Sequence, residues 1–113
     1  MNYTIIIVSK TLTSIPTKID YKIIDECEIV DNYSLNFNNA TIYFDYLIFD
    51  DLNLIKNFNK IETENNYVIT NYNFQTSIEN FFAVGKIVRT NKSIETSIND
   101  IIEYIMDPEA DIF

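Results

Sequence analysis

Residues 66–88, NYVITNYNFQTSIENFFAVGKIV, form the most informative stretch of the chain. We expect a short strand over Tyr67–Thr70, a turn at Asn71–Asn73 and a buried strand over Phe81–Val88. The single glycine of the protein, Gly85, lies near the end of the last strand. A glycine at a strand end that is followed by a helix can admit the polar chain of a ligand. This stretch therefore carries both a fold prediction and a site prediction.

Gly85, Lys86 and Ile87 are the first candidate binding site, because they fall at the end of this apolar strand. Lys86 could bind a phosphate group as a compact positive charge. The simpler interpretation is that Gly85 only ends a strand and that Lys86 is a solvated side chain. Both interpretations stay open at the level of the sequence.

The same stretch resembles the flavin-side closing segment of the thioredoxin reductase-like flavoproteins, which are pyridine nucleotide-disulphide oxidoreductases. In that family, the motif Q-T-S-x-P-G leads into a buried strand that ends F-A-x-G-D. The matching residues here are Gln75, Thr76, Ser77, Phe82, Ala83 and Gly85. Glu79 and Asn80 stand at the Pro-Gly positions, and Lys86 replaces the aspartate that hydrogen-bonds the ribityl chain of the flavin. The resemblance implies a truncated, degenerate C-terminal part of such a flavoprotein, with a vestigial flavin position at Gly85, Lys86 and Ile87.

The resemblance continues upstream, where residues 44–58, FDYLIFDDLNLIKNF, are similar to the end of the family's pyridine-nucleotide domain. The region from Tyr21 to Phe44 resembles the β-meander of that domain. A Rossmann site needs G-x-G-x-x-G so that the backbone can approach a pyrophosphate, and Gly85 is the only glycine. We therefore expect no bound cofactor, with FAD as the alternative.

Length and composition favour one domain with its own hydrophobic core. The 113 residues are 47% hydrophobic and 14% aromatic despite a net charge of −9, which is too apolar for a disordered chain. We predict a single domain over residues 1–106 and an acidic flexible tail over 107–113. The predicted fold class is α/β or α+β, a mainly β domain with an antiparallel hairpin region and one C-terminal helix.

The apolar pattern predicts the elements of this domain. Tyr3–Val8 is a continuous apolar run, which is typical of a strand buried on both faces near the middle of a sheet. The other expected elements are a loop over Ser9–Lys18, strands over Tyr21–Ile24, Glu26–Val30, Tyr33–Phe37 and Thr41–Phe49 with turns at Asp31–Asn32 and Asn38–Asn39, and an amphipathic turn at Leu52, Leu54, Ile55 and Phe58. Asp45 is expected to interrupt its strand. Ser93 is the predicted cap of a helix whose apolar positions are Ile94, Ile98, Ile101, Ile102 and Ile105, and Pro108 is expected to stop that helix.

Charge and composition exclude several kinds of function. Eight Lys and Arg against seventeen Asp and Glu leave little to neutralise phosphates or anionic lipids, so we expect neither nucleic acid nor membrane as a partner. The N-terminal apolar run is too short for a membrane span and lacks the flanks of a signal peptide, which makes a cytoplasmic location the default. The chain has no histidine and one cysteine, Cys27, which excludes C-x-x-C and cysteine-zinc chemistry. We expect a buried Cys27 whose pKa is raised by Glu26 and Glu28.

Two further sets of side chains deserve a structural test. Asp45, Asp50 and Asp51 could hold a hard cation, although a solvated turn is the simpler interpretation and we expect no metal. The aromatic residues Tyr43, Phe44, Tyr46, Phe49, Phe81 and Phe82 could line an apolar pocket or an oligomer interface, although we expect most of them in the core.

The leading hypothesis is a non-catalytic module, derived from a thioredoxin reductase, for structural or protein–protein interaction. A protein partner or self-association would cover apolar surface that a chain with eight Tyr and eight Phe leaves exposed. One alternative is a residual FAD-binding module that acts as a dimer or with a partner chain. Another is an acidic inhibitor of a nucleic-acid-binding protein. An autonomous enzyme is not expected, because no histidine, activated cysteine or phosphate loop is present.

Overall fold

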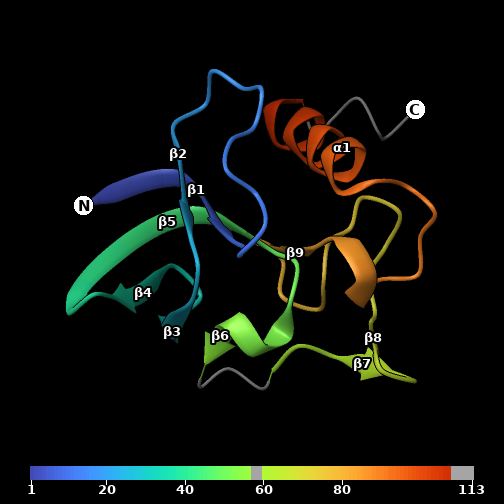
Figure 1. The fold of residues 1–113 in the computed structure, drawn as a ribbon, viewed down its shortest axis with the longest axis horizontal. Coiled ribbons are helices and arrows are strands. Elements are labelled where there is room, and N and C mark those ends of the chain that lie inside the picture. The colour runs from blue at the N-terminus through green and yellow to red at the C-terminus, as the bar shows by residue number, and fades with distance from the viewer. Residues whose placement is uncertain (57–59, 108–113) are drawn as a thin grey trace.

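The computed structural model describes residues 1–56 and 60–107, in which a mixed β-sheet, a small hairpin and one helix form a single domain (Figure 1). The strands are β1 (Asn2–Val8), β2 (Tyr21–Ile24), β3 (Cys27–Asp31), β4 (Ser34–Phe37), β5 (Ala40–Phe49), β6 (Ile55–Lys56), β7 (Thr63–Glu64), β8 (Tyr67–Val68) and β9 (Phe81–Ala83). The helices are the 3₁₀ turns η1 (Leu52–Leu54) and η2 (Gly85–Ile87) and the α-helix α1 (Ile94–Met106). The predicted fold class, mainly β with a hairpin region and one C-terminal helix, is therefore confirmed.

The main sheet has the order β2-β1-β5-β4-β3-β6, and β9 also pairs with β5. β1 pairs in parallel with both β2 and β5, and β5 pairs in parallel with β9. β3, β4 and β5 form an antiparallel meander, and β6 joins β3 in parallel. The prediction of a meander from Tyr21 to Phe44 is therefore wrong for its first strand. β2 does not join the meander but pairs with the edge of β1 that faces away from β5.

β5 changes its neighbour halfway along one edge. One edge of β5 pairs with β1 over most of its length. On the opposite edge, the first half of β5 pairs with β4 and the second half pairs with β9. Asn80 lies at this junction: its side-chain Nδ2 donates to the carbonyl oxygens of Asn32 at 2.7 Å and Asp45 at 2.9 Å. Its own carbonyl accepts from the N–H of Leu47. Asp45 therefore does not interrupt β5, contrary to expectation, but marks where the strand exchanges one partner for the other.

The core lies on β1, the second half of β5, β9 and the inner face of α1. No side chain from Ile5 to Val8 is more than 1% exposed, as expected for a strand covered on both faces. α1 begins at the predicted cap, where the Ser93 hydroxyl accepts from the N–H of Thr96. Its buried isoleucines are Ile98, Ile101 and Ile102, and the Tyr104 ring meets Phe82 edge-on at 6.1 Å.

Tight turns between the strands use asparagines in the left-handed conformation. Asn38 and Asn39 have φ values of 50° and 62° and join β4 to β5, as predicted. Asn65 and Asn66 do the same between β7 and β8. Asparagine tolerates positive φ better than other residues with a Cβ, and this pair of positive φ values matches the twist of a two-residue hairpin.

Two other predictions require correction or fall outside the described residues. The strand expected over Phe81–Val88 ends at Ala83, because the positive φ of Gly85 cannot continue an extended strand and η2 follows. The amphipathic turn expected from Leu52 is the 3₁₀ turn η1 followed directly by β6. Phe58, Pro108 and all but the first residue of the predicted tail lie outside the described residues.

Candidate functional site

The predicted site residues Gly85, Lys86 and Ile87 form the 3₁₀ turn η2 between β9 and α1. Gly85 has φ +79°, a conformation that favours glycine. A Cβ at this position would lie 3.2 Å from Cδ1 and 3.3 Å from Cγ1 of Ile94, the first residue of α1. Both the backbone angle and the close packing therefore give the glycine a structural role.

A wide, open depression of about 940 Å³ borders this turn. Its lining includes Gly85 and Lys86, but not Ile87, together with the cationic side chains of Arg89 and Lys92. The Arg89 guanidinium lies 5.1 Å from the centre of the Tyr67 ring, and the Lys92 ammonium is 2.6 Å from Asp100. Two of these cations are therefore already engaged within the protein.

The side chain that follows Gly85 differs in charge from the family motif, which has an aspartate where this chain has Lys86. Lys86 is exposed and places a positive charge where the family has an acceptor. The flavin role of Gly85, Lys86 and Ile87 stays a prediction, and no chemical step is derived from it.

Two of the three aspartates considered for a cation, Asp50 and Asp51, have structural partners. Asp50 accepts a hydrogen bond from the Ser9 hydroxyl at 2.6 Å, which ties the end of β5 to the end of β1. Asp51 caps η1 by accepting from the N–H of Asn53 at 2.9 Å. Within residues 1–56 and 60–107, no three Asp, Glu, Cys or His side chains are grouped so that they could hold a metal ion.

Cys27 is a buried residue of β3, as expected. Burial, reinforced by the negative charge of Glu26, raises the pKa of its thiol to about 12. The thiolate is the nucleophilic form of cysteine, so burial and the raised pKa both disfavour a nucleophilic role for Cys27.

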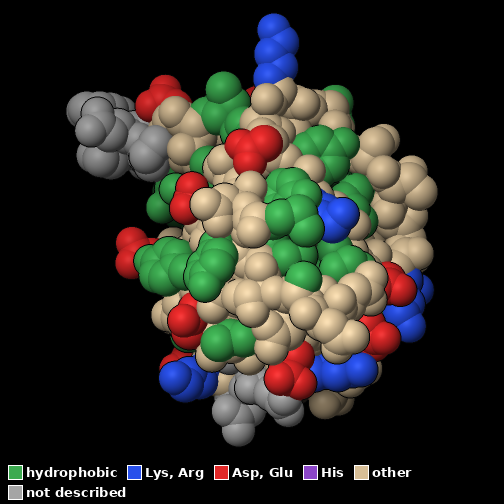
Figure 2. All heavy atoms as spheres, turned by 90° about the vertical axis from the view of Figure 1, so that its left-hand side faces the viewer, with side chains coloured by type: hydrophobic (Ala, Val, Ile, Leu, Met, Phe, Trp, Pro, Cys, Tyr) green, Lys and Arg blue, Asp and Glu red, His purple; other side chains and the backbone are tan. Residues whose placement is uncertain are grey.

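The aromatic residues divide between core and surface. Phe44, Phe49, Phe81 and Phe82 are buried, which confirms the expectation for most of this set. Tyr43, by contrast, is 54% exposed, and the neighbouring Tyr33 is 59% exposed. Tyr43 pairs with Asn2 at the start of β1 and with Ser34, the residue after Tyr33, on β4. Figure 2 shows the left-hand side of Figure 1, where hydrophobic side chains are grouped across the middle of the face, with acidic and basic side chains among and around them.

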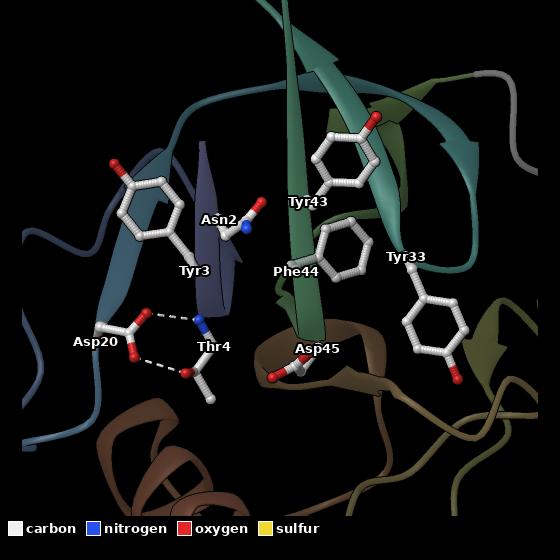
Figure 3. Close-up of a pocket in the computed structure, with 8 residues that line it drawn as sticks. All are labelled: Asn2, Tyr3, Thr4, Asp20, Tyr33, Tyr43, Phe44 and Asp45. Atoms are coloured by element: carbon white, nitrogen blue, oxygen red, sulfur yellow. Dashed lines mark hydrogen bonds between the residues drawn. The ribbon is translucent and has the colours of Figure 1, made fainter.

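The exposed rings border a shallow depression of about 700 Å³, which we call the aromatic groove. Its lining residues are Asn2, Tyr3, Thr4, Asp20, Tyr33, Tyr43, Phe44 and Asp45 (Figure 3). The parallel register of β1 and β5 sets Asn2 beside Tyr43 and Tyr3 beside Phe44. In Figure 3, Tyr3 and Asp20 flank the β1 side of the groove, and Tyr33 and Tyr43 flank the β5 side.

The charged groups of the aromatic groove are both carboxylates. One oxygen of Asp20 accepts from the N–H of Thr4 at 2.7 Å, and the other accepts from the Thr4 hydroxyl at 2.6 Å. These hydrogen bonds, led by that from the hydroxyl, lower the pKa of Asp20. Asp45 is exposed, and among the lining residues of the described chain no Lys or Arg balances either charge. The groove is therefore aromatic and negatively charged.

Sequence reasoning identified Tyr43 and Asp45 but not the groove. The alternation of exposed Tyr43 and Asp45 with buried Ile42 and Phe44 is a period-two signal that was available in the sequence. The approach of Asp20 to Thr4 was not, because it depends on the crossover of β2 to the edge of β1.

No family model matches the chain. Among solved structures, the fold has a weak similarity to a ferredoxin-flavin thioredoxin reductase from Clostridium acetobutylicum, with a TM-score of 0.32 and 15% sequence identity. The alignment covers 93% of this chain and 50% of that chain, so this protein spans about half the length of the structure it matches. A similarity at this level carries no argument about activity. Across the described part of the chain, none of the helices has the length and apolar character of a membrane span.

Proposed function

We propose that this protein is a non-catalytic module that works by protein–protein contact, and that it descends from a thioredoxin reductase-like flavoprotein. The observation that carries the contact role is the aromatic groove, where Tyr33 and Tyr43 remain 59% and 54% exposed. Tyrosine is enriched in protein interfaces, because its ring buries a large area while its hydroxyl can still hydrogen-bond. The proposed descent rests on the Gln75–Ser77 and Phe82–Gly85 motifs of the sequence.

Three features of the described residues support a non-catalytic role. Cys27 is buried and its pKa is raised, which removes the only thiol from nucleophilic chemistry. Gly85 packs against Ile94, which gives the flavin-motif glycine a reason to persist without a cofactor. Asp50 and Asp51 are used to hold strand and helix ends.

The contact role is tested by comparing variants of the full chain as bait in an extract of cells that naturally express it. Tyr33→Ser combined with Tyr43→Ser should reduce recovery of a specific partner at least about tenfold, because central aromatic residues carry most of the binding energy of an interface. Tyr72→Ser is the matched control, since Tyr72 is 77% exposed but lies outside the aromatic groove. Sedimentation equilibrium of the same variants shows whether the partner is a second copy. The proposal would be contradicted if the wild type, the double variant and Tyr72→Ser recovered equal amounts of partner and had equal masses in sedimentation.

The flavin alternative has a separate test in the absorbance spectrum of the purified protein. After incubation with FAD and desalting, we expect no flavin bands. Retention of about one flavin per chain, as expected for a specific site, would contradict the non-catalytic proposal and make Gly85 and Lys86 a functional site.

A further inference from the structure

We propose that the aromatic groove binds an exposed segment of a protein partner through an arginine or lysine side chain of that segment. This inference rests on the contact role proposed above and adds the chemistry of the partner. It starts from the pairing of two exposed tyrosines with carboxylates in one depression.

The negative charge extends beyond the aromatic groove itself. A second depression of about 440 Å³ shares Tyr33 and Asp45 with the groove and continues past Asn80 to Glu79. No Lys or Arg is among the described residues that line either depression. Because the two depressions share Tyr33 and Asp45, they place Asp20, Asp45 and Glu79 on adjoining surface, which suits an extended basic segment better than a single ion.

The carboxylates are available to such a segment. Asp20 is fixed by its two hydrogen bonds to Thr4, but each carboxylate oxygen can accept a further bond. No hydrogen bond or ion pair occupies the Asp45 carboxylate within residues 1–56 and 60–107. A guanidinium or ammonium group would satisfy these acceptors with charge-assisted hydrogen bonds.

The tyrosine rings suit the same side chains. A cation over the face of an aromatic ring is attracted by the ring's electron density, and the aliphatic stem of Arg or Lys packs on apolar surface while its charge stays in water. The protein already uses this contact internally, because Arg89 lies 5.1 Å from the centre of the Tyr67 ring.

Charge also argues against a second copy of this chain as the occupant. A symmetric dimer places the same patch on both sides of the interface, so a groove-to-groove contact would bring Asp20 and Asp45 against the same residues of the other copy. The net charge of −9 would repel the second copy at longer range and attract a basic partner.

The test is fluorescence anisotropy of the full-length protein with a labelled peptide that alternates arginine and glycine. A peptide with citrulline in place of arginine keeps the shape and removes the charge. We expect binding of the arginine peptide and at least about a tenfold weaker binding of the citrulline peptide, consistent with loss of charge-assisted bonds. Equal binding of both peptides would overturn the proposal.

Matched variants separate the groove from general attraction to an acidic protein. Asp20→Asn with Asp45→Asn and the control Glu62→Gln with Glu64→Gln each change the net charge from −9 to −7. The groove variant should lose at least about tenfold in affinity and the control less than about twofold. Equal losses would mean non-specific attraction and would overturn the inference. Asp45→Asn alone serves if the double variant does not fold, because Asp45 is exposed.

The outcome also distinguishes this inference from the proposed function. If the peptide does not bind, but Tyr33→Ser with Tyr43→Ser still loses a natural partner, the contact role stands and the basic chemistry of the partner is wrong. If neither experiment shows an effect, both proposals fail. A dimer that depends on these tyrosines would likewise support contact while overturning the basic segment.

Discussion

Gly85 shows how a residue that suggests a ligand site can instead be required by packing. Two independent features constrain this position. Its φ is +79°, and a Cβ at this position would lie 3.2 Å from Cδ1 of Ile94. Only glycine meets both without strain. In this chain they occur where β9 must turn sharply and deliver α1 against the sheet.

We therefore expect Gly85→Ala to lower the free energy of unfolding by about 1–3 kcal/mol, from backbone strain and the contact with Ile94. Ile94→Val removes the closest carbon, Cδ1, so the double variant should lose less than the sum of the single variants. Urea unfolding followed by circular dichroism measures all four proteins. An alanine variant as stable as the wild type would show that the glycine is not needed for the fold.

Asp31 is a second residue whose role is set locally, in the turn between β3 and β4. Its carboxylate accepts from the N–H of Tyr33 at 2.8 Å and from the Ser34 hydroxyl at 2.9 Å. These bonds, chiefly the one from the Tyr33 N–H, lower the pKa of Asp31 below its ordinary value of 3.8. A carboxylate with a lowered folded-state pKa stabilises the fold above its unfolded pKa, and this contribution is lost as pH falls through the folded value.

Asp31→Asn should therefore unfold at lower urea concentration than the wild type at about pH 6, and the difference should shrink toward about pH 2.5. Ser34→Ala is the comparison, since it removes one donor while leaving the charge. If the gap between wild type and Asp31→Asn stayed constant across this range, the charge of Asp31 would have no part in the stability of the turn.

At the scale of elements, β5 is the strand on which the sheet depends, because it pairs with β1, β4 and β9. Where it passes from β4 to β9, the Asn80 side chain donates to the backbone carbonyls of Asn32 and Asp45. Asn80 is 7% exposed, so its amide depends on these two bonds rather than on water.

Asn80→Ala is expected to lower the free energy of unfolding by about 1–3 kcal/mol, because it removes both hydrogen bonds of a buried side-chain amide. Asn99→Ala, on the exposed face of α1, should change stability by less than about 0.5 kcal/mol. Thermal unfolding of the purified variants provides the comparison. Similar effects for both asparagines would show that Asn80 does not hold the junction.

The elements themselves were largely predictable, but their pairing was not. The apolar run of β1, the Asn38–Asn39 turn and the Ser93 cap are local signals, and the structure has each of them. β2 follows β1 directly in the sequence but pairs with it in parallel, while β9 pairs with β5 from a distant part of the sequence. No local pattern distinguishes these two strands from other short apolar segments. The aromatic groove depends on these pairings, so only its alternating strand was accessible to sequence reasoning.

For the whole molecule, charge is the dominant long-range property. The net charge is −9 and the Cα radius of gyration is 13.2 Å. The Debye length is about 30 Å in 0.01 M salt and about 3 Å in 1 M salt. The carboxylates therefore repel one another across the entire molecule at low salt, but only at short range at high salt.

We expect the thermal unfolding temperature to rise as NaCl increases from about 0.01 M to about 0.3 M, because screening relieves this repulsion. Glu28→Gln combined with Glu62→Gln, both at exposed positions, changes the net charge from −9 to −7. This variant should show a smaller rise of the unfolding temperature with salt. Differential scanning calorimetry at matched protein concentration measures both proteins. An identical rise for the two would point to salt effects other than charge screening.

The parallel pairing of β1 also sets the order in which the chain can fold during its synthesis. The apolar run Ile5–Val8 is made before its partner residues on β5, which extend to Phe49. β9, which covers the rest of β5, begins only at Phe81. Contacts this distant in sequence form slowly, and an uncovered apolar strand favours aggregation while it waits. β1 is therefore open to wrong contacts until the residues of β5 have been made.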